Sequence, residues 1–481
     1  MAMASDRIPL GPLDHISPHN IPQSVMYLSL KQGVKAVDAF IHLQEGLRRT
    51  LLQVPWLSGS VHWQRKETPG WRPGKLEIRH RESTTGASAL IQFKELATPK
   101  SYTNLRDAGF PLDAFDDEDM IWTKPWNPDY ETGVPVFAAQ ANFLPGGCFL
   151  VFSIASPASD GTAMLMIIKI WADHCSNLSK TLNDDLIKVL PLETFDRGSL
   201  DEALVRERGT PERAPVESKE ARQLIGLPPE QTNPVCDSSA AGEVEMKHTI
   251  FYMPHTAYTA LLKQCVVELG NTNIAGNDLI SALIWRSLMR AWVATKPNDV
   301  LEPVSELLRP FDARPNFAQS FQTIYLGTLN FENRITMSLG TLVSQDISIA
   351  SVAQTIRAAA DSQAAQENLL DAYALLRDTP DYNQVQWRAT HTSGASVGIL
   401  SPIVLPFNDT CLGKGIFGNE GKPDAFRPIM GACNRGFRTC FVIPRKKHGG
   451  LEFVMTLSEE EMNFLEDDDE FSRYAFPIGL L

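Results

Sequence analysis

Apolar side chains recur along this chain with two different periods, which separate its predicted helices from its predicted strands. Residues 35–53 carry apolar side chains every three or four positions, the spacing of an amphipathic helix, and Pro55 marks the end of that helix. Residues 56–66 and 75–82 instead alternate between apolar and polar side chains, which predicts two strands. The residues that give the helical spacing are Val37, Phe40, Leu43, Leu47 and Leu51.

The stretch from Cys148 to Cys175 predicts a strand, a short loop and a helix in succession. Residues 148–155 form a continuous apolar run rich in β-branched and aromatic side chains, and residues 161–171 return to helical spacing. In the loop between them, Asp160 can accept hydrogen bonds from nearby amides, and Gly161 permits a tight turn. Because such a loop presents side chains into a cleft, we expect the functional site here.

The second half of the chain repeats this mixture of strands and helices. We predict a strand at 248–253, helices at 257–269 and 278–292, and one or two helices within 345–377. Either Asn277 or Asp278 is expected to cap the second of these helices.

Two regions lack sustained periodicity. Residues 101–135 are rich in Asp, Pro and aromatic side chains, so we interpret them as irregular cover over the first lobe. Residues 209–245 carry Pro, Glu, Ser and Gln with few large apolar side chains, a composition typical of a linker. We therefore expect an N-terminal lobe at 1–208, a crossover linker at 209–245 and a C-terminal lobe at 246–481.

Charge and hydropathy exclude several classes of partner. The chain has 481 residues, 43% of them hydrophobic, and a formal net charge of -13, which argues against binding nucleic acid or an anionic membrane. No apolar run approaches the roughly 18 residues that span a bilayer, and no basic region precedes an apolar core near the N-terminus. We expect a cytoplasmic monomer that acts on a small molecule, with no nucleic-acid or membrane partner.

Neither the cysteines nor the histidines predict a metal site or a disulfide framework. The seven cysteines contain no C-x-x-C pair, and their odd number favours reduced, mostly buried thiols. His15 and His19 are four positions apart, but Ser17-Pro18 between them does not favour a helix that would bring them together. We expect no metal.

Several segments together resemble the BAHD superfamily of CoA-dependent acyltransferases, most closely its fungal branch of trichothecene 3-O-acetyltransferase-like proteins. The resemblance spans roughly residues 9–475 and implies an α/β fold with two lobes, as in BAHD and chloramphenicol-acetyltransferase-like proteins. Mixed sheets flanked by helices would enclose a channel between the lobes. The matching segments are the opening at 9–29, the strand, loop and helix at 148–175, Asn277-Asp278 with Trp285-Arg286, Asp312 with Arg314, and Tyr325 with Gly327.

The family loop reads His-x-x-x-Asp-Gly, and its histidine is the general base that deprotonates the acceptor. This chain has Ser156 at that position, and a serine hydroxyl is not basic at neutral pH. A positioned base supplies about 10²- to 10⁴-fold in rate. The resemblance gives Asp160 an orienting, structural role and pairs it with Arg314. Pro157 biases Ser156 toward extended geometry, which suits a hydrogen-bond donor that points into a cavity.

The second family signature, Asp-Phe-Gly-Trp-Gly, is also altered. Here it reads Cys411-Leu412-Gly413-Lys414-Gly415, so both glycines remain, while Ser401-Pro402 replaces an upstream Ser-Trp. In the family the aspartate is structural and pairs with an arginine far from the chemistry. The change to Cys411 would therefore remove a salt bridge.

The remaining candidates each have an alternative interpretation. Ser24, Tyr27, Gly161, Ser401 and Cys411 are candidate substrate contacts, although Tyr27 would equally suit the core and Ser24 a turn. His391 is either a substitute base or an exposed loop histidine. A basic cluster could meet a CoA phosphate or could be a solvated strand end. It comprises Arg435, Arg438, Arg445, Lys446 and Lys447.

Three functions remain open on the sequence alone. The first, which the missing base favours, is cyclisation or isomerisation, including a pericyclic step, of a bulky apolar polyketide, terpenoid or alkaloid intermediate in fungal secondary metabolism. Such a reaction needs no cofactor and gains from orientation alone. The second is an O- or N-acyltransferase with a displaced base and a CoA thioester as donor. The third is a ligand-binding protein without catalysis.

Overall fold

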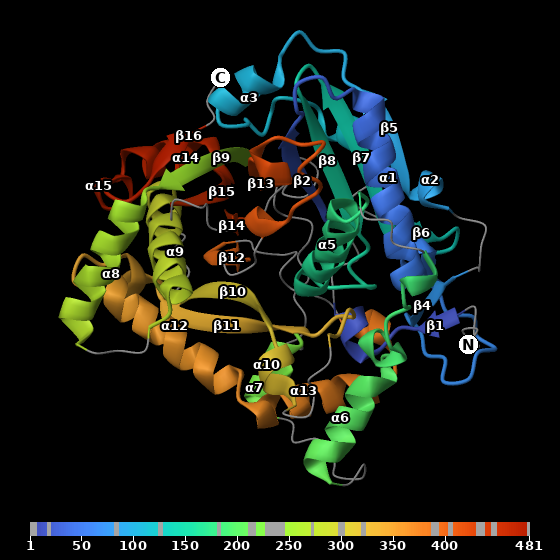
Figure 1. Ribbon diagram of the computed structural model, residues 1–481. Helices are drawn as coiled ribbons and strands as arrows, with labels where there is room; N and C mark the ends of the chain where they lie inside the picture. Colours follow the sequence, from blue (N-terminus) through green and yellow to red (C-terminus); the bar gives the residue numbers. More distant parts are fainter. Residues whose placement is uncertain are drawn as a thin grey trace.

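The structure is a computed structural model that combines three β-sheets with helices packed around them (Figure 1). Within the part of the chain that it describes, no helix is both long and apolar enough to cross a bilayer. The described residues are 7–16, 21–80, 86–123, 128–179, 184–209, 218–226, 246–270, 274–296, 304–318, 324–385, 394–402, 407–429, 438–443 and 450–478.

The first half of the chain builds most of a five-stranded sheet with the order β13-β2-β8-β7-β5. All eight residues of β8 are buried, which confirms the strand predicted from the apolar run that begins at Cys148. Strand β2 pairs antiparallel with β8, and Ser24 lies opposite Phe152. The strands are β2 (Gln23–Ser29), β5 (Ile91–Glu95), β7 (Phe137–Leu144), β8 (Gly147–Ile154) and β13 (Ala425–Pro428).

Two long helices, α1 (Ala36–Gln53) and α5 (Gly161–Ser176), lie together beside this sheet (Figure 1). They touch closely at Gly46, where a Cβ atom would stand 2.2 Å from the Cys175 sulfur. Both helices were predicted from their apolar spacing. Val37 is the exception within α1, because its side chain is 53% exposed while Leu43 and Leu47 are buried.

The second half of the chain builds a mixed seven-stranded sheet with the order β11-β10-β12-β14-β15-β9-β16. Its apolar side chains form one core with helices α8, α9 and α12. The strands are β9 (Met246–Met253), β10 (Val304–Asp312), β11 (Asn330–Ser338), β12 (Ser396–Leu400), β14 (Thr439–Ile443), β15 (Leu451–Ser458) and β16 (Phe476–Ile478). The helices are α8 (His255–Leu269), α9 (Gly276–Ala294), α11 (Leu339–Val343), α12 (Ile349–Gln363), α14 (Glu459–Asp467) and α15 (Asp469–Ser472).

A small third sheet and a group of shorter helices complete the fold. The sheet order is β1-β4-β3-β6, and β3 and β4 confirm the two alternating strands predicted after α1. Its strands are β1 (Arg7–Pro9), β3 (Ser60–Trp63), β4 (Leu76–Arg79) and β6 (Val134–Pro135). The remaining helices are α2 (Ala87–Leu90), α3 (Tyr102–Asp107), α4 (Asp117–Met120), α6 (Gly198–Arg208), α7 (Lys219–Leu224), α10 (Arg314–Phe317) and α13 (Gln366–Asp378).

One local prediction is wrong, and a second holds only in part. Helix α9 begins at Gly276 with Ala275 as its cap, so neither Asn277 nor Asp278 is the cap residue. Asp278 lies inside the first turn, where its Oδ2 atom accepts a hydrogen bond from the Ala275 amide at 3.2 Å. The region 101–135, interpreted as irregular cover, is irregular over most of its described residues but contains the short helices α3 and α4.

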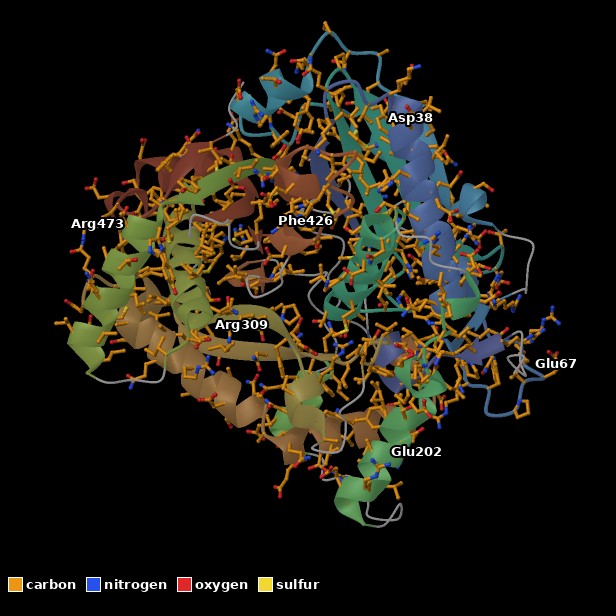
Figure 2. All side chains as sticks on the ribbon, in the orientation of Figure 1. Asp38, Glu67, Glu202, Arg309, Phe426 and Arg473 are labelled. Atoms are coloured by element: carbon orange, nitrogen blue, oxygen red, sulfur yellow. The ribbon has the colours of Figure 1, made fainter. Side chains whose placement is uncertain are left out.

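Residues near the C-terminus bind the two large sheets together. Strand β13 pairs with β2, so residues 425–428 extend the sheet built by the first half of the chain. Figure 2 labels Phe426 on this strand. Next to it, Arg427 forms an ion pair with Glu452 of β15 at 2.6 Å, and both side chains are buried. The lobe boundaries stay a prediction, and most of the expected linker, 210–217 and 227–245, lies outside the described residues.

Candidate functional site

The loop between β8 and α5 has the strand, loop and helix arrangement that the sequence predicts. The Ala155 amide donates to the Val136 carbonyl at 3.0 Å, and the Ala158 amide donates back to the Ala155 carbonyl at 2.8 Å, which closes a turn. Asp160 caps α5, because its Oδ1 atom accepts from the Ala163 amide at 2.9 Å. Residues 155–163 are therefore fixed by their own backbone and by the helix cap.

Asp160 and Arg314 form the ion pair that the family resemblance implies. The two carboxylate oxygens each lie 3.0 Å from a guanidinium nitrogen, and Oδ2 also accepts from the Leu329 amide at 2.8 Å. The Asp160 side chain is 2% exposed and that of Arg314 is 10% exposed. With four donors around it, the Asp160 carboxylate is fully engaged, so its geometry suits an orienting group and leaves no lone pair pointed at a substrate.

Arg314 is held as firmly as its partner. It donates to Asp312 at 2.7 Å, to the Tyr325 carbonyl at 3.1 Å and to the Gly327 carbonyl at 2.8 Å. Burial works against its charged form, but Asp160 and Asp312 outweigh that effect and raise the pKa of Arg314. The pair therefore fixes the start of α5 to the segment that follows β10.

The other loop residues differ in their exposure. Ser156 is buried, with 9% of its surface accessible, and it lies two residues after the end of β8. Gly161 is exposed, and a Cβ atom there would meet no atom within 4 Å. Its backbone is part of the α5 helix, so the tight turn predicted for Gly161 is not formed. Contact of Ser156 or Gly161 with a substrate stays a prediction.

A second arginine, Arg197, binds the same loop at Ala158. Arg197 is 5% exposed and donates to the Ala158 carbonyl at 2.6 Å, to the Phe195 carbonyl at 2.6 Å and to Asp14 Oδ2 at 2.9 Å. Sequence reasoning missed this residue. Only Asp14 carried a signal, because it belongs to the Leu-x-x-Leu-Asp segment that resembles the opening of the family.

His15, next to Asp14, is saturated by its own contacts. Its Nε2 atom accepts from the Leu76 amide at 3.0 Å, so Nδ1 carries the proton and donates to the Gly11 carbonyl at 2.7 Å. The ring also stacks on Tyr382 with 4.1 Å between centroids. A ring with both nitrogens engaged and one face covered has no free lone pair, so His15 is not the missing base.

Most of the other described histidines also have polar partners away from the loop. His42 contacts the Leu412 carbonyl, His62 contacts Ser60 and His80 contacts Ser58. His174 contacts Gln53 and His248 contacts Thr456. His255, whose ring has no hydrogen-bond partner among the described residues, is the first residue of α8, which packs with the seven-stranded sheet. His391, the predicted substitute base, lies outside the described residues.

Tyr27 and Ser24 lie on β2 and point to opposite faces of its sheet. Tyr27 stacks on Phe110 with 4.3 Å between ring centroids and meets Phe149 edge-on at 4.7 Å. This aromatic packing fits the core interpretation of Tyr27. Ser24 is buried between Phe152 of β8 and Pro428 of β13 rather than in a turn. Substrate contact by either residue stays a prediction.

The altered second signature lies at the far end of α5. The Cys411 carbonyl accepts from the Ser176 hydroxyl at 2.5 Å, and the Cys411 thiol donates to the Glu420 carbonyl at 3.4 Å. Sixteen helical residues span about 24 Å, so α5 separates Cys411 from Ser156. Ser401 follows β12 and donates to Asn277 Oδ1 on α9 at 2.5 Å. Ser156 and Cys411 therefore do not share one site, and substrate contact by Ser401 or Cys411 stays a prediction.

One glycine of this signature is required by its surroundings. Gly413 has φ +125°, and a Cβ atom there would lie 2.4 Å from Nε2 of His42. That nitrogen donates to the Leu412 carbonyl at 2.8 Å, and burial lowers the pKa of His42. Gly415, by contrast, has open space where its side chain would be. The backbone at residue 413 therefore requires glycine, although three side chains of the signature have changed.

The described residues contain no metal cluster, and the one described arginine of the basic cluster is already paired. No group of three or more metal-ligating side chains occurs in that part of the chain. Arg438 of the basic cluster is committed to Glu461, with contacts of 2.7 to 3.1 Å, and to the Gly394 carbonyl. The cluster's other members, Arg435, Arg445, Lys446 and Lys447, lie outside the described ranges. Arg438 therefore does not fit a CoA phosphate.

Comparison with known proteins places the chain in a family. The profile of the trichothecene 3-O-acetyltransferase-like N-terminal domain matches residues 23–175, and the profile of the transferase family matches residues 112–472. The isocyanide synthase-NRPS hybrid crmA of Aspergillus fumigatus is similar, with 28% identity over 97% of this chain, which spans only 31% of that protein. Acyltransferase BOA11 of Botryotinia fuckeliana is 25% identical, with 98% and 97% of the two chains covered.

The fold has a solved counterpart. The crystal structure of Fusarium sporotrichioides TRI101, complexed with coenzyme A and T-2, superimposes with a TM-score of 0.75 at 20% identity and covers 98% of this chain and 100% of its own. That agreement confirms the two-lobed α/β fold expected from the sequence. Because the transferase profile covers most of the chain, this protein belongs to the transferase family, with the BAHD-like fold of the trichothecene 3-O-acetyltransferases.

Proposed function

We propose that this protein is a fungal secondary-metabolism enzyme that cyclises or isomerises a bulky apolar intermediate beside the loop at residues 156–161. The observation that carries the proposal is that the loop keeps its buried ion pair but lacks the histidine that serves as general base in the resembling family. Asp160 still binds Arg314 through both oxygens, while Ser156 occupies the position of the histidine in the resembling family. Acyl transfer to an unactivated hydroxyl needs that base, whereas an intramolecular rearrangement does not.

The buried ion pair between Asp160 and Arg314 supports a functional role for the loop. Removing a carboxylate and a guanidinium from water is expensive, and replacing such a pair with apolar side chains is often neutral or stabilising. This chain keeps the pair, and it also keeps Arg197 on the neighbouring carbonyl of Ala158. A loop held at two successive points is suited to hold one hydroxyl, that of Ser156, in a fixed direction.

The proposed reaction requires only that the protein orient the substrate and donate one hydrogen bond. Orientation of one reactive conformer contributes several kcal/mol in favourable cases. The Ser156 hydroxyl donates a hydrogen bond to a substrate carbonyl as negative charge develops there, and it keeps its proton throughout. The substrate and product are isomers, so no oxidant, acyl donor or cofactor enters the balance. The protein would act in the cytoplasm as a monomer. Sedimentation or size-exclusion chromatography would check the monomeric state.

Acyl transfer is the second candidate, and similarity to acyltransferase BOA11 over nearly the whole chain favours it. In that case a CoA thioester would supply the acyl group. The acceptor would have to be nucleophilic already, or His391 would have to act as the base. A binding protein without catalysis is the third candidate, which the two damaged signatures favour.

Metabolite masses separate these candidates. The compound that accumulates on gene deletion is purified, incubated with the protein, and compared with its product by accurate mass and chromatography. A product of equal mass and new retention time supports the proposal. A mass increase equal to an acyl group, dependent on acyl-CoA, overturns it in favour of transfer. No conversion with or without acyl-CoA, together with tight binding of the compound, supports the third candidate.

Substitution then tests Ser156 itself. Ser156→Ala should lower turnover by about 10²-fold, the loss typical of one removed donor to a developing oxyanion. Ser287→Ala is the matched control, because Ser287 is a buried serine on α9 in the other core. Unchanged turnover in Ser156→Ala would remove the serine from the mechanism. His391→Ala separates the second candidate, since only a displaced base predicts loss of activity there.

A further inference from the structure

We infer that Arg197, held by Asp14, is a positioning residue for the loop at residues 156–161, where it fixes the peptide carbonyl of Ala158. This inference rests on the proposed function of that loop. Arg197 adds a second contact to the loop besides the Asp160 and Arg314 pair, at residue 158, two residues from Ser156.

The contacts of Arg197 are those of a directional clamp. Its guanidinium reaches three acceptors at 2.6 to 2.9 Å, of which only Asp14 is charged. The other two are backbone carbonyls, at Phe195 and Ala158. The guanidinium also lies over the Trp56 ring, 5.8 Å from its centroid. A flat group with three acceptors in its plane and a ring on its face has one permitted orientation.

Asp14 is positioned before it meets Arg197. Its Oδ2 atom accepts from the Gly11 amide at 2.8 Å, and its Oδ1 atom accepts from the Thr328 amide at 3.3 Å. The side chain is 1% exposed. Gly11 is needed for this approach, because a Cβ atom there would stand 2.9 Å from Cγ of Arg197.

The two clamps converge on one short segment of the chain. Thr328 donates its amide to Asp14, and the next residue, Leu329, donates its amide to Asp160. Arg197 therefore holds the loop at residue 158, and Arg314 holds it at residue 160. The carboxylates that pair with these two arginines, Asp14 and Asp160, accept hydrogen bonds from adjacent backbone amides. A displacement of either arginine would tilt the peptide between them.

The contact between Arg197 and the Ala158 carbonyl also restricts Ser156, which lies two residues earlier in the chain. Pro157 restricts the backbone of Ser156, and the turn from Ala155 to Ala158 fixes the peptide that follows. With the Ala158 carbonyl held, rotation of this turn is blocked. Without it, the Ser156 hydroxyl would sample directions that do not meet the substrate.

The test exchanges the guanidinium for a group of equal charge. Arg197→Lys keeps the charge beside Asp14 but cannot serve three planar acceptors. Arg309→Lys is the matched control, since Arg309 (Figure 2) is a buried arginine that pairs with Asp278 at 2.8 Å in the other large sheet. Hydrogen exchange of peptides covering residues 155–163 is measured in each variant, alongside thermal unfolding and turnover of the deletion-derived intermediate.

In Arg197→Lys we expect exchange over 155–163 to rise by about 10-fold, which corresponds to a local opening equilibrium shifted by one factor of ten. Turnover should fall with little change in KM, while Arg309→Lys changes neither. Arg197→Ala should recover slow exchange over the same peptides in millimolar guanidinium chloride, and not in ammonium chloride. Unchanged exchange over 155–163 in a folded Arg197→Lys protein would overturn the inference.

Exchange also separates this inference from the proposed function, because it requires no substrate. Faster exchange over 155–163 in a protein that turns out to be an acyltransferase would keep Arg197 as a positioning residue and discard only the isomerase proposal. If Arg197→Ala fails to fold, Asp14→Asn is the second variant. It keeps Arg197 but weakens its anchor, and loop exchange equal to that of the unmodified protein would again overturn the inference.

Discussion

Asp160 and Arg314 meet through two contacts of 3.0 Å although 154 positions separate them in the sequence. The pair joins the N-terminal end of α5 to the segment after β10, and so joins a helix beside one large sheet to a strand of the other. Its location makes a stability prediction that does not depend on the reaction.

Asp160→Asn should lower the free energy of unfolding by about 3 kcal/mol, near the lower end for breaking a buried pair. The loss is limited because Asp312 still faces Arg314 at 2.7 Å. Chemical denaturation measures it. Asp173→Asn, which breaks the exposed pair with Lys169, is the control and should change stability by less than about 0.5 kcal/mol. Equal effects of the two substitutions would contradict the assignment of Asp160 as a buried anchor.

The two glycines of the altered signature should respond differently to alanine. Gly413→Ala forces an L side chain to φ +125° and against the His42 ring, which should cost about 2–4 kcal/mol. Gly415→Ala places its methyl group in open space and should change the free energy of unfolding by less than about 0.5 kcal/mol. Thermal and urea unfolding of both variants check this, and a stable Gly413→Ala would show that the path around residues 411–415 is not constrained.

Thr328 carries a hydroxyl that the fold does not use. Its side chain is fully buried, and its Oγ1 atom has no hydrogen-bond partner among the described residues. Thr328→Val keeps the shape and removes the unpaired polar atom, so the free energy of unfolding should rise by about 1 kcal/mol. Thr50→Val should change it in the opposite direction, because the Thr50 hydroxyl donates to the Gly46 carbonyl at 2.9 Å. A destabilised Thr328→Val would reveal a partner for that hydroxyl.

The free energy of unfolding should depend on pH below the unperturbed pKa of histidine. Burial lowers the pKa of four histidines, His42, His62, His174 and His248. Below the unperturbed value of 6.5 the unfolded chain takes up protons that the folded protein refuses, so the free energy of unfolding falls as pH falls and is fully present above that value. Denaturation midpoints measured from roughly pH 5 to 8 test this. His42→Gln should flatten the slope, and an unchanged slope would exclude His42 as a contributor.

Local patterns were enough to find the elements that frame the site. The apolar run of β8 and the helical spacing of α1 and α5 depend only on which neighbours of a residue face the same side, so they can be predicted from the chain itself. The spacing also misassigned Val37, because whether a helix position is covered depends on the neighbouring elements and not on the helix.

The family resemblance added one long-range contact, between Asp160 and Arg314, and no more. Nothing in the sequence pairs β13 with β2, which are about 400 positions apart, or Arg427 with Glu452. The same holds for the saturation of His15, which depends on Leu76 and Tyr382 arriving from distant segments.

The sequence by itself determined the α/β composition, the main helices and strands, and the replacement of the expected base by Ser156. The tertiary structure alone decided that Arg197, paired with Asp14 from 183 positions away, binds the loop at Ala158, and that Cys411 lies at the opposite end of α5 from Ser156. The physical reason is the sequence separation of the interacting residues. Helical and strand periodicity depends on residues a few positions apart, whereas the contacts of a guanidinium with distant carbonyls form only after the chain has packed.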